Sequence, residues 1–440
     1  MGSTLIEHIF GWQSSNPNLC DAGHRETIGA MGGPSQSPRA RRDTRPRPAR
    51  VSRLEGIDMA RGAALLAMMA THVLPTYEQD PATSAWLPTW IGLAFSGRAA
   101  ALFAVLAGVS LTLGSVPAAA NRAGLALRAA VIAAVGLTLG LAEVNVAVIL
   151  VQYALLFWCA LPVVRLHRQA LGLLAAAWLL GAPIVAYLVR PALLSAVPPL
   201  RLGHNPAWGD LASPARLLAD LTVTGYYPAL QWFGYILVGL WIGRADLGRA
   251  ANQAWLVVGG LAAAVIAKAC AWAFLSPLGG MNVLLGTEQA RIWPLRAMLE
   301  ANLSGVDQTG TWWWLTTAAP HSGTTLDLLH TCGTSAAAIG AFLLLARIGP
   351  LVRTGLLAPL AGAGAMTLTL YSAHVWALSL PLADAAHLTR EALLAVHLAA
   401  ALAIGLFVRA NGWRGPLEWL AHGASRAGLL SSRAARTRRR

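Results

Sequence analysis

The sequence is poor in charged residues and nearly devoid of lysine. Only 12% of its 440 residues are charged, which is about half the fraction found in a typical soluble domain. Lys268 is the single lysine, and the 33 basic residues exceed the 19 acidic ones to give a formal net charge of +14. Because 56% of the residues are hydrophobic and the mean hydropathy is +0.54, the composition excludes an ordinary soluble protein and indicates a polytopic membrane protein.

Cysteine and the common catalytic motifs are also scarce. The four cysteines, Cys20, Cys159, Cys270 and Cys332, have no CxxC or metal-ligand spacing, so we expect neither a disulfide framework nor a bound metal. No GxSxG, HExxH, Walker-type or GxGxxG motif stands in a fitting context, which leaves hydrolase, zinc protease and ATP-driven pump functions without support. The basic residues lie mostly between apolar stretches and in the tails, where membrane topology explains them, so we expect no nucleic-acid partner.

The sequence contains ten apolar stretches long enough to cross a bilayer. Arginines concentrate in the connections that would share one side with both termini, and the positive-inside rule places that side in the cytoplasm. The excess of Arg over Lys, with abundant Ala and Gly, is typical of a GC-rich bacterial genome. We therefore predict an all-α fold, a polytopic membrane helical bundle of about ten helices in the cytoplasmic (inner) membrane of a bacterium, with both termini cytoplasmic. The stretches are 56–75, 92–114, 124–142, 146–164, 169–189, 226–243, 254–275, 327–347, 357–380 and 391–409.

Composition also divides the chain into segments. Residues 1–52 mix polar, Pro and Arg residues without the apolar core of a signal peptide, and we expect a disordered basic cytoplasmic tail. Residues 53–422 form the predicted membrane domain, and residues 423–440 a second basic cytoplasmic tail. Two outer connections, 190–225 and 276–326, are longer than connection requires, and we expect them to cap the membrane domain from outside.

The first apolar stretch carries three ionisable residues, Asp58, Arg61 and His72. Such groups are costly in a membrane helix and need a reason. At about 100° per residue they share one face, with Asp58 and Arg61 at the inner end and His72 roughly 21 Å further along. Asp58 and Arg61 are expected either to form a structural ion pair or to bind an anionic cytosolic group. His72 could act as a general base or could hydrogen-bond to a neighbouring helix.

Further polar residues are predicted at the outer depth of His72. Asp327 and His330 are three residues apart and can face one direction. If the group converges, Asp327 could orient a histidine, while Arg98 or a tyrosine hydroxyl stabilises a developing oxyanion. A sequence gives the depth of a residue but not the rotation of its helix, so convergence is a hypothesis. The predicted catalytic set is His72, Arg98, Tyr227, Asp327, His330 and His374.

Several segments in order along the chain resemble one family of membrane proteins. The opening RLEGIDMARGAALLAMMATHVLP is followed by ILVQYALLFW, GYYPALQWFGYILVGLWIGR, AMTLTLYSAHV and finally GPLEWL. Over roughly residues 52–422 this ordered set resembles the heparan-alpha-glucosaminide N-acetyltransferase-like and YeiB-like proteins. The resemblance implies a multi-helix membrane acyltransferase fold, in which an acyl group, such as acetyl, passes from cytosolic acyl-CoA to a sugar across the membrane.

The resemblance also implies roles for particular residues. Asp58, Arg61 and Arg244 would lie near the acyl-CoA donor, and His72 near the acceptor. The N-acetyltransferase branch has a His before its second helix and an Asp early in it. This chain has no His between Pro75 and Arg98, and Arg98 stands near the place of that Asp. The catalytic histidine of that branch therefore cannot be carried over, and His72 or His330 is the expected base.

The leading hypothesis is acyl transfer to a hydroxyl or amine of an envelope glycan or glycolipid. The expected partners are acyl-CoA as co-substrate, that acceptor and membrane lipid, with a homo-oligomer left open. One alternative is a transporter whose pathway is lined by the buried ionisable residues, and another is a non-enzymatic membrane scaffold. Transporters often have repeated halves and broken helices at the midplane, whereas the polar residues here gather towards helix ends.

Overall fold

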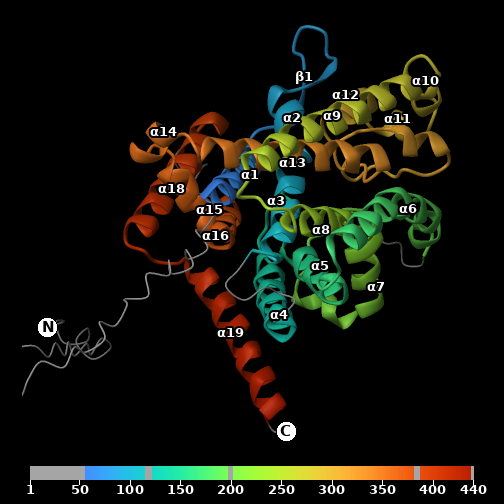
Figure 1. Cartoon of the computed structure of the whole chain (residues 1–440). Coiled ribbons are helices and arrows are strands. Elements are labelled where there is room, and N and C mark those ends of the chain that lie inside the picture. Colours follow the sequence, from blue (N-terminus) through green and yellow to red (C-terminus); the bar gives the residue numbers. More distant parts are fainter. Residues whose placement is uncertain (1–54, 114–120, 197–201, 381–386, 438–440) are drawn as a thin grey trace, which may run out of the picture. The chain divides into compact units, whose positions relative to one another are not determined.

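The structure, a computed structural model, describes residues 55–113, 121–196, 202–380 and 387–437 (Figure 1). These residues form many helices and one short two-stranded sheet, which confirms the predicted all-α class. The predicted tail over residues 1–52 lies outside the described residues. In the described part, six helical segments are long and apolar enough to cross a membrane. They are α2–α3 (Trp90–Phe95 and Arg98–Ser110), α4 (Arg122–Leu139), α6 (Arg168–Leu194), α9 (Ala250–Leu275), α13 (Thr325–Leu345) and α18 (Arg390–Ala410).

The other four apolar stretches are also helical, but they are shorter, more polar or broken. The helix over the stretch 357–380 breaks at Met366. The ionisable residues of the first stretch lower its mean hydropathy. The count of ten membrane crossings and the side of the termini therefore stay predictions. These helices are α1 (Glu55–Val73), α5 (Leu150–Val163), α8 (Ala229–Gly243) and the pair α15 (Ala358–Ala365) and α16 (Thr367–Ser379).

Helix α1 lies among the other helices rather than at their edge. It contacts α3, α13, α15 and α18 (Figure 1). The contact with α15 depends on two glycines, since a Cβ at Gly62 would lie 2.2 Å from the Leu360 carbonyl oxygen, and one at Gly364 would lie 1.7 Å from that of Asp58. Small residues allow helix backbones to approach this closely in membrane proteins. The Arg-Gly step of the first stretch therefore fixes the spacing of Asp58 and Arg61 against α15.

The segments between the long helices are folded into short elements. In residues 276–326, a second apolar cluster surrounds Trp314, whose side chain is fully buried and donates to the Thr309 carbonyl at 2.9 Å. These short elements are β1 (Tyr77–Gln79), β2 (Trp86–Pro88), η1 (Trp208–Ala212), α7 (Pro214–Ala219), η2 (Asp220–Thr224), α10 (Gly280–Leu285), α11 (Gln289–Ile292), α12 (Leu295–Ala301), η3 (Trp312–Thr316) and α14 (Gly349–Arg353). The strands pair antiparallel with Tyr77 opposite Pro88.

The C-terminal segment is a single helix, α19 (Pro416–Thr437). It begins before the predicted domain boundary at residue 422 and runs through most of the predicted tail, packing along α4 (Figure 1). Asn121, which caps α4 by accepting from the Gly124 amide, also donates to the Ser425 carbonyl of α19 at 3.0 Å. The segment beyond 422 is therefore tied to the helical domain as far as it is described.

Candidate active site

Three histidines from three helices form a row, in which His374 contacts both His72 and His397. His72 lies in the last turn of α1, His374 in α16 and His397 in α18. Nδ1 of His72 is 3.2 Å from Nε2 of His374, and Nδ1 of His374 is 2.9 Å from Nδ1 of His397. The rings of His72 and His374 are stacked with centroids 5.3 Å apart. The structure thus brings together two residues of the predicted set, and it adds His397, which that set lacked.

The contacts between these rings limit where protons can lie. Each contact needs one N–H and one lone pair, and a neutral imidazole offers one of each. In one consistent assignment, His72 donates from Nδ1 to His374, and His374 donates from its own Nδ1 to His397. The lone pair of His72 Nε2 is then available to accept a proton. In the reverse assignment His72 Nε2 carries the proton. A shift of protons along the three histidines therefore converts His72 from a proton acceptor into a proton donor.

Tyr371 connects the histidines to a cavity. It lies on α16 one turn before His374, and its ring meets that of His72 edge-on with centroids 6.2 Å apart. Its hydroxyl accepts from the Ile149 amide at 3.3 Å and donates to the Ala147 carbonyl at 3.2 Å. These bonds fix the ring of a residue that contacts His72 and also lines a cavity.

The cavity has a volume of about 460 Å³. Arg61 and Met68 both line it, and seven helical residues correspond to about 10 Å, so it follows α1 over this length and its last lining residue on α1, Met68, is one turn before His72. Three guanidinium groups, from Arg61, Arg128 and Arg414, line it together with one carboxylate, that of Glu418, and with hydroxyl-bearing and apolar side chains. Guanidinium groups bind phosphate through two parallel hydrogen bonds. A cavity of this kind suits a ligand with anionic and apolar parts.

Asp58 and Arg61 form the predicted ion pair. Nη1 of Arg61 donates to Asp58 Oδ1 at 2.7 Å, and Nη2 donates to the Ser110 hydroxyl of α3. Asp58 is 2% exposed, whereas Arg61 is half-buried and faces the cavity. The two expectations for the pair are therefore compatible, because the carboxylate orients a guanidinium that still lines the cavity.

Arg244 lies elsewhere. Its Nη2 donates to the Val164 carbonyl after α5 at 2.6 Å. It is not among the described residues that line the cavity of Arg61. A role for Arg244 at the acyl donor stays a prediction without a contact to support it.

Arg98 and His330 form a second polar contact. Nε of Arg98, at the start of α3, donates to Nε2 of His330 at 3.2 Å. A histidine whose Nε2 accepts carries its proton on Nδ1, and this nitrogen lies 3.1 Å from the Ala264 carbonyl of α9. Both ring nitrogens of His330 are therefore engaged. The arrangement suits a residue that positions Arg98 better than it suits a base.

Asp327 lies in the first turn of α13, three residues before His330. Its Oδ2 accepts from the Gly323 amide at 3.0 Å, and its backbone amide is capped by the Thr324 hydroxyl. Among the described residues it has no hydrogen bond to a histidine, so the proposed orienting role is not observed in the contacts. Arg98 and Lys268 are the cations that interact with it electrostatically.

Tyr227 has no hydrogen bond to a histidine among the described residues, although it interacts electrostatically with Tyr371. Its ring packs on Trp232 with centroids 4.8 Å apart, and on His321 at 6.0 Å. His321 belongs to the loop before α13 and has a positive φ of 64°. Burial lowers the pKa of His321 to about 4, so its imidazole is neutral at pH 7. The six predicted catalytic residues thus fall into the pair His72 and His374, the group around Arg98, and Tyr227.

Glu418 explains one landmark of the sequence, the segment GPLEWL. Its Oε1 accepts from the backbone amides of Leu368 and Thr369 at 2.6 and 3.2 Å, and Oε2 accepts from the Thr369 hydroxyl at 2.6 Å. These groups stand at the start of α16, where a carboxylate satisfies unpaired amides and interacts favourably with the helix dipole. Glu418 therefore fixes the helix that carries Tyr371 and His374.

The sequence held a signal for most of the residues that the predicted set missed. His397 and Arg128 lie within the apolar stretches 391–409 and 124–142, where an ionisable residue indicates a functional site by the same argument as for His72. Arg414 precedes the GPLEWL segment and had no comparable signal. In the described part of the chain, no group of three or more His, Cys, Asp or Glu side chains is arranged to hold a metal ion.

The fold and these contacts define an all-α protein with helices suited to a membrane and a polar site between them. The catalytic-domain family of heparan-alpha-glucosaminide N-acetyltransferase matches residues 53–272, and the chain belongs to this family. The predicted resemblance is confirmed over these residues, which include His72, Arg98 and Tyr227. No curated protein gives a significant match to the chain.

Proposed function

We propose that the protein transfers an acyl group, such as acetyl, from acyl-CoA to a hydroxyl or amine of an envelope glycan or glycolipid. The observation that carries this proposal is that Tyr371 lines the cavity of Arg61, Arg128 and Arg414 and also packs edge-on against His72. Membership of an acetyltransferase family supports the same reaction class. The phosphates of the donor would bind the three guanidiniums, and its thioester would lie towards Tyr371.

The proposed step needs one base and no external reagent. The acceptor hydroxyl or amine attacks the thioester carbonyl, forming a C–O or C–N bond while the C–S bond breaks. His72 Nε2 takes the proton from the attacking group and returns a proton to the leaving thiolate. His374 and His397 would support the transient charge on His72 by passing a proton along their contacts. A positioned base of this kind typically contributes about 10²- to 10⁴-fold in rate.

The proposal places the donor on the cytoplasmic side and the acceptor on the outer side of a bacterial inner membrane. The positive-inside bias of the arginines supports this orientation. On α1, the cavity residue Arg61 and the base His72 are separated by eleven residues, or about 16 Å along the helix. An acyl group bound through the inner guanidiniums could therefore reach a base near the opposite surface.

Binding of the donor tests the proposal directly. We expect acetyl-CoA to raise the melting temperature of the purified protein in lipid nanodiscs, because a ligand of the folded state stabilises it by mass action. Arg414→Gln should weaken acetyl-CoA binding by roughly tenfold, since one charge-assisted contact is lost. Arg249→Gln is the matched control, because Arg249 is exposed and does not line the cavity.

Turnover is measured on the same samples with radiolabelled acetyl-CoA and extracted envelope glycans and glycolipids. Label transferred to an acceptor, with a higher KM for acetyl-CoA in Arg414→Gln alone, supports the proposal. Equal losses in Arg414→Gln and Arg249→Gln would argue against this cavity as the donor site. A protein that shows neither stabilisation by acetyl-CoA nor label transfer would favour a transporter or a scaffold.

A further inference from the structure

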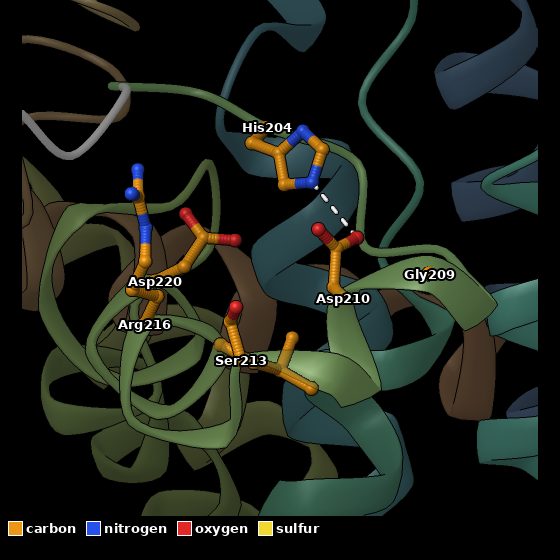
Figure 2. A pocket seen from close by; sticks show the side chains of 7 residues that line it. His204, Gly209, Asp210, Ser213, Arg216 and Asp220 are labelled. Atoms are coloured by element: carbon orange, nitrogen blue, oxygen red, sulfur yellow. Dashed lines mark hydrogen bonds and ion pairs between the residues drawn. The ribbon is translucent and has the colours of Figure 1, made fainter. Parts of the chain in front are cut away.

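A second cavity lies in the segment between α6 and α8, and its described lining residues include none of His72, His374 and His397. It has a volume of about 340 Å³ and is built from residues 204–220 around η1 and α7. Figure 2 shows Arg216 and Asp220 on one side of a common space, and His204 and Asp210 on the other, with Ser213 between them. The lining residues of this cavity and those of the cavity around Arg61 do not overlap.

Asp220 is the unusual residue of this cavity. It is only 6% exposed, and neither of its carboxylate oxygens has a hydrogen-bond partner in the part of the chain that the structure describes. Burial raises the pKa of this carboxyl group to about 7. A buried polar group without a partner costs stability, and a hydrogen bond from a bound ligand would offset that cost. Because Asp220 lines the cavity, a bound ligand could donate to it.

Hydrogen bonds orient two of the other lining residues, Asp210 and His204. Asp210 Oδ2 accepts from the Ala207 amide at 2.8 Å and contacts Nε2 of His204 at 3.0 Å (Figure 2). Arg216 brings a guanidinium, which only donates hydrogen bonds, and Ser213 brings a hydroxyl, which both donates and accepts. The cavity therefore presents acceptors and donors side by side.

This mixture of groups selects the class of ligand. Two carboxyl groups disfavour an anion, and the guanidinium disfavours a cation. A neutral polyol meets both, because each hydroxyl can donate to a carboxylate and accept from a guanidinium. We propose that this cavity binds a neutral saccharide, whose hydroxyl groups donate to Asp220 and accept from Arg216. The site is separate from the proposed transfer site and needs no acyl donor.

Calorimetric titration of the full chain tests this proposal. The protein is held in phosphatidylcholine nanodiscs, because detergents with sugar headgroups would compete. The probes are methyl α-glucoside, methyl α-galactoside and methyl α-mannoside as neutral saccharides, glucosamine as a cation and inorganic phosphate as an anion. We expect at least one neutral glycoside to bind. Asp220→Asn should weaken that binding by roughly 10- to 100-fold, since a hydrogen bond to a charged group is lost.

Two further variants make each outcome decisive. Glu288→Gln removes an acidic group from the exposed surface of another connection, outside this cavity, and should leave the affinity unchanged. If Asp220→Asn fails to fold, Ser213→Ala replaces it, with an expected loss of several-fold. Absence of glycoside binding, binding of glucosamine or phosphate alone, or unchanged affinity in the folded cavity variants would each overturn the proposal. Because no acyl-CoA is present, the result does not depend on the proposed transferase activity.

Discussion

The two histidine groups of the helical domain differ in what their ring nitrogens contact. His330 receives a hydrogen bond from Arg98 on one nitrogen and lies against the Ala264 carbonyl with the other. His72 contacts a histidine through Nδ1 alone, and that histidine contacts a third one. A saturated imidazole cannot take up a proton without losing a hydrogen bond, whereas His72 can retain its contact while Nε2 accepts one. The residues are of the same type, but of the two only His72 keeps a ring nitrogen without a hydrogen bond among the described contacts.

The first prediction therefore compares His72→Ala with His330→Ala. We expect His72→Ala to lower acyl transfer by about 10²- to 10⁴-fold, the usual effect of removing a general base. His330→Ala should act mainly on stability, because Arg98 loses a buried acceptor. The measurements are turnover and melting temperature of each variant in nanodiscs.

Added imidazole separates a chemical role from a structural one. Free imidazole should partly restore turnover to His72→Ala, since it can fill the space of the lost side chain and act as a base. It should not restore His330→Ala. Rescue of the second variant alone would reverse the comparison and assign the base to the group around Arg98.

The second prediction concerns α16, the helix that carries His374 and Tyr371 but neither Arg98 nor His330. Glu418→Gln keeps the size of the side chain but removes the charge that caps this helix. Loss of a helix cap typically costs about 1 kcal/mol, and the start of α16 would loosen where it positions Tyr371 and His374. If this loss is felt in full at the site, we expect turnover to fall by roughly fivefold, because about 1.36 kcal/mol corresponds to a factor of ten.

A glutamate in the first turn of another helix serves as the matched control. Glu391 stands in the first turn of α18, the helix of His397, and is exposed without a contact of this kind. Glu391→Gln should leave turnover close to that of the unmodified protein. If both variants lose activity equally, general loss of acidic charge explains the effect, and α16 has no special part in it.

The class of fold could be predicted from the sequence, and so could individual residues of the site, but not the contacts between them. Apolar length predicted the helices, since the cost of exposing backbone in a membrane leaves few alternatives. It also indicated His72 and His374, because an ionisable residue in an apolar stretch is expensive. It could not join them, because a contact between α1 and α16 depends on helix rotation and on the close approach allowed by Gly62 and Gly364.

The sequence also could not separate the predicted outer set into groups. His330 and His374 have the same local pattern, a histidine within an apolar helix. Their difference arises from Arg98 and the Ala264 carbonyl, which lie 232 and 66 residues away along the chain. Asp220 gave no signal at all, because its burial depends on how η1, α7 and η2 fold around it.

The smallest expected effect concerns Asp220 and the pH dependence of stability. Burial raises the pKa of Asp220 from 3.8 to about 7 in the folded protein. His204 acts against this rise, and the charge of Asp210 adds to it. Between these values the folded state binds one more proton than the unfolded state, so stability falls as pH rises through this window. Asp220→Asn should remove that fall. We expect its melting temperature to exceed that of the unmodified protein by a few degrees at pH 8 and to match it near pH 4, with Glu288→Gln following the unmodified protein throughout. A melting temperature that falls equally in all three proteins would mean that Asp220 ionises in the folded state as it does in the unfolded one, and would place the pH dependence in other groups.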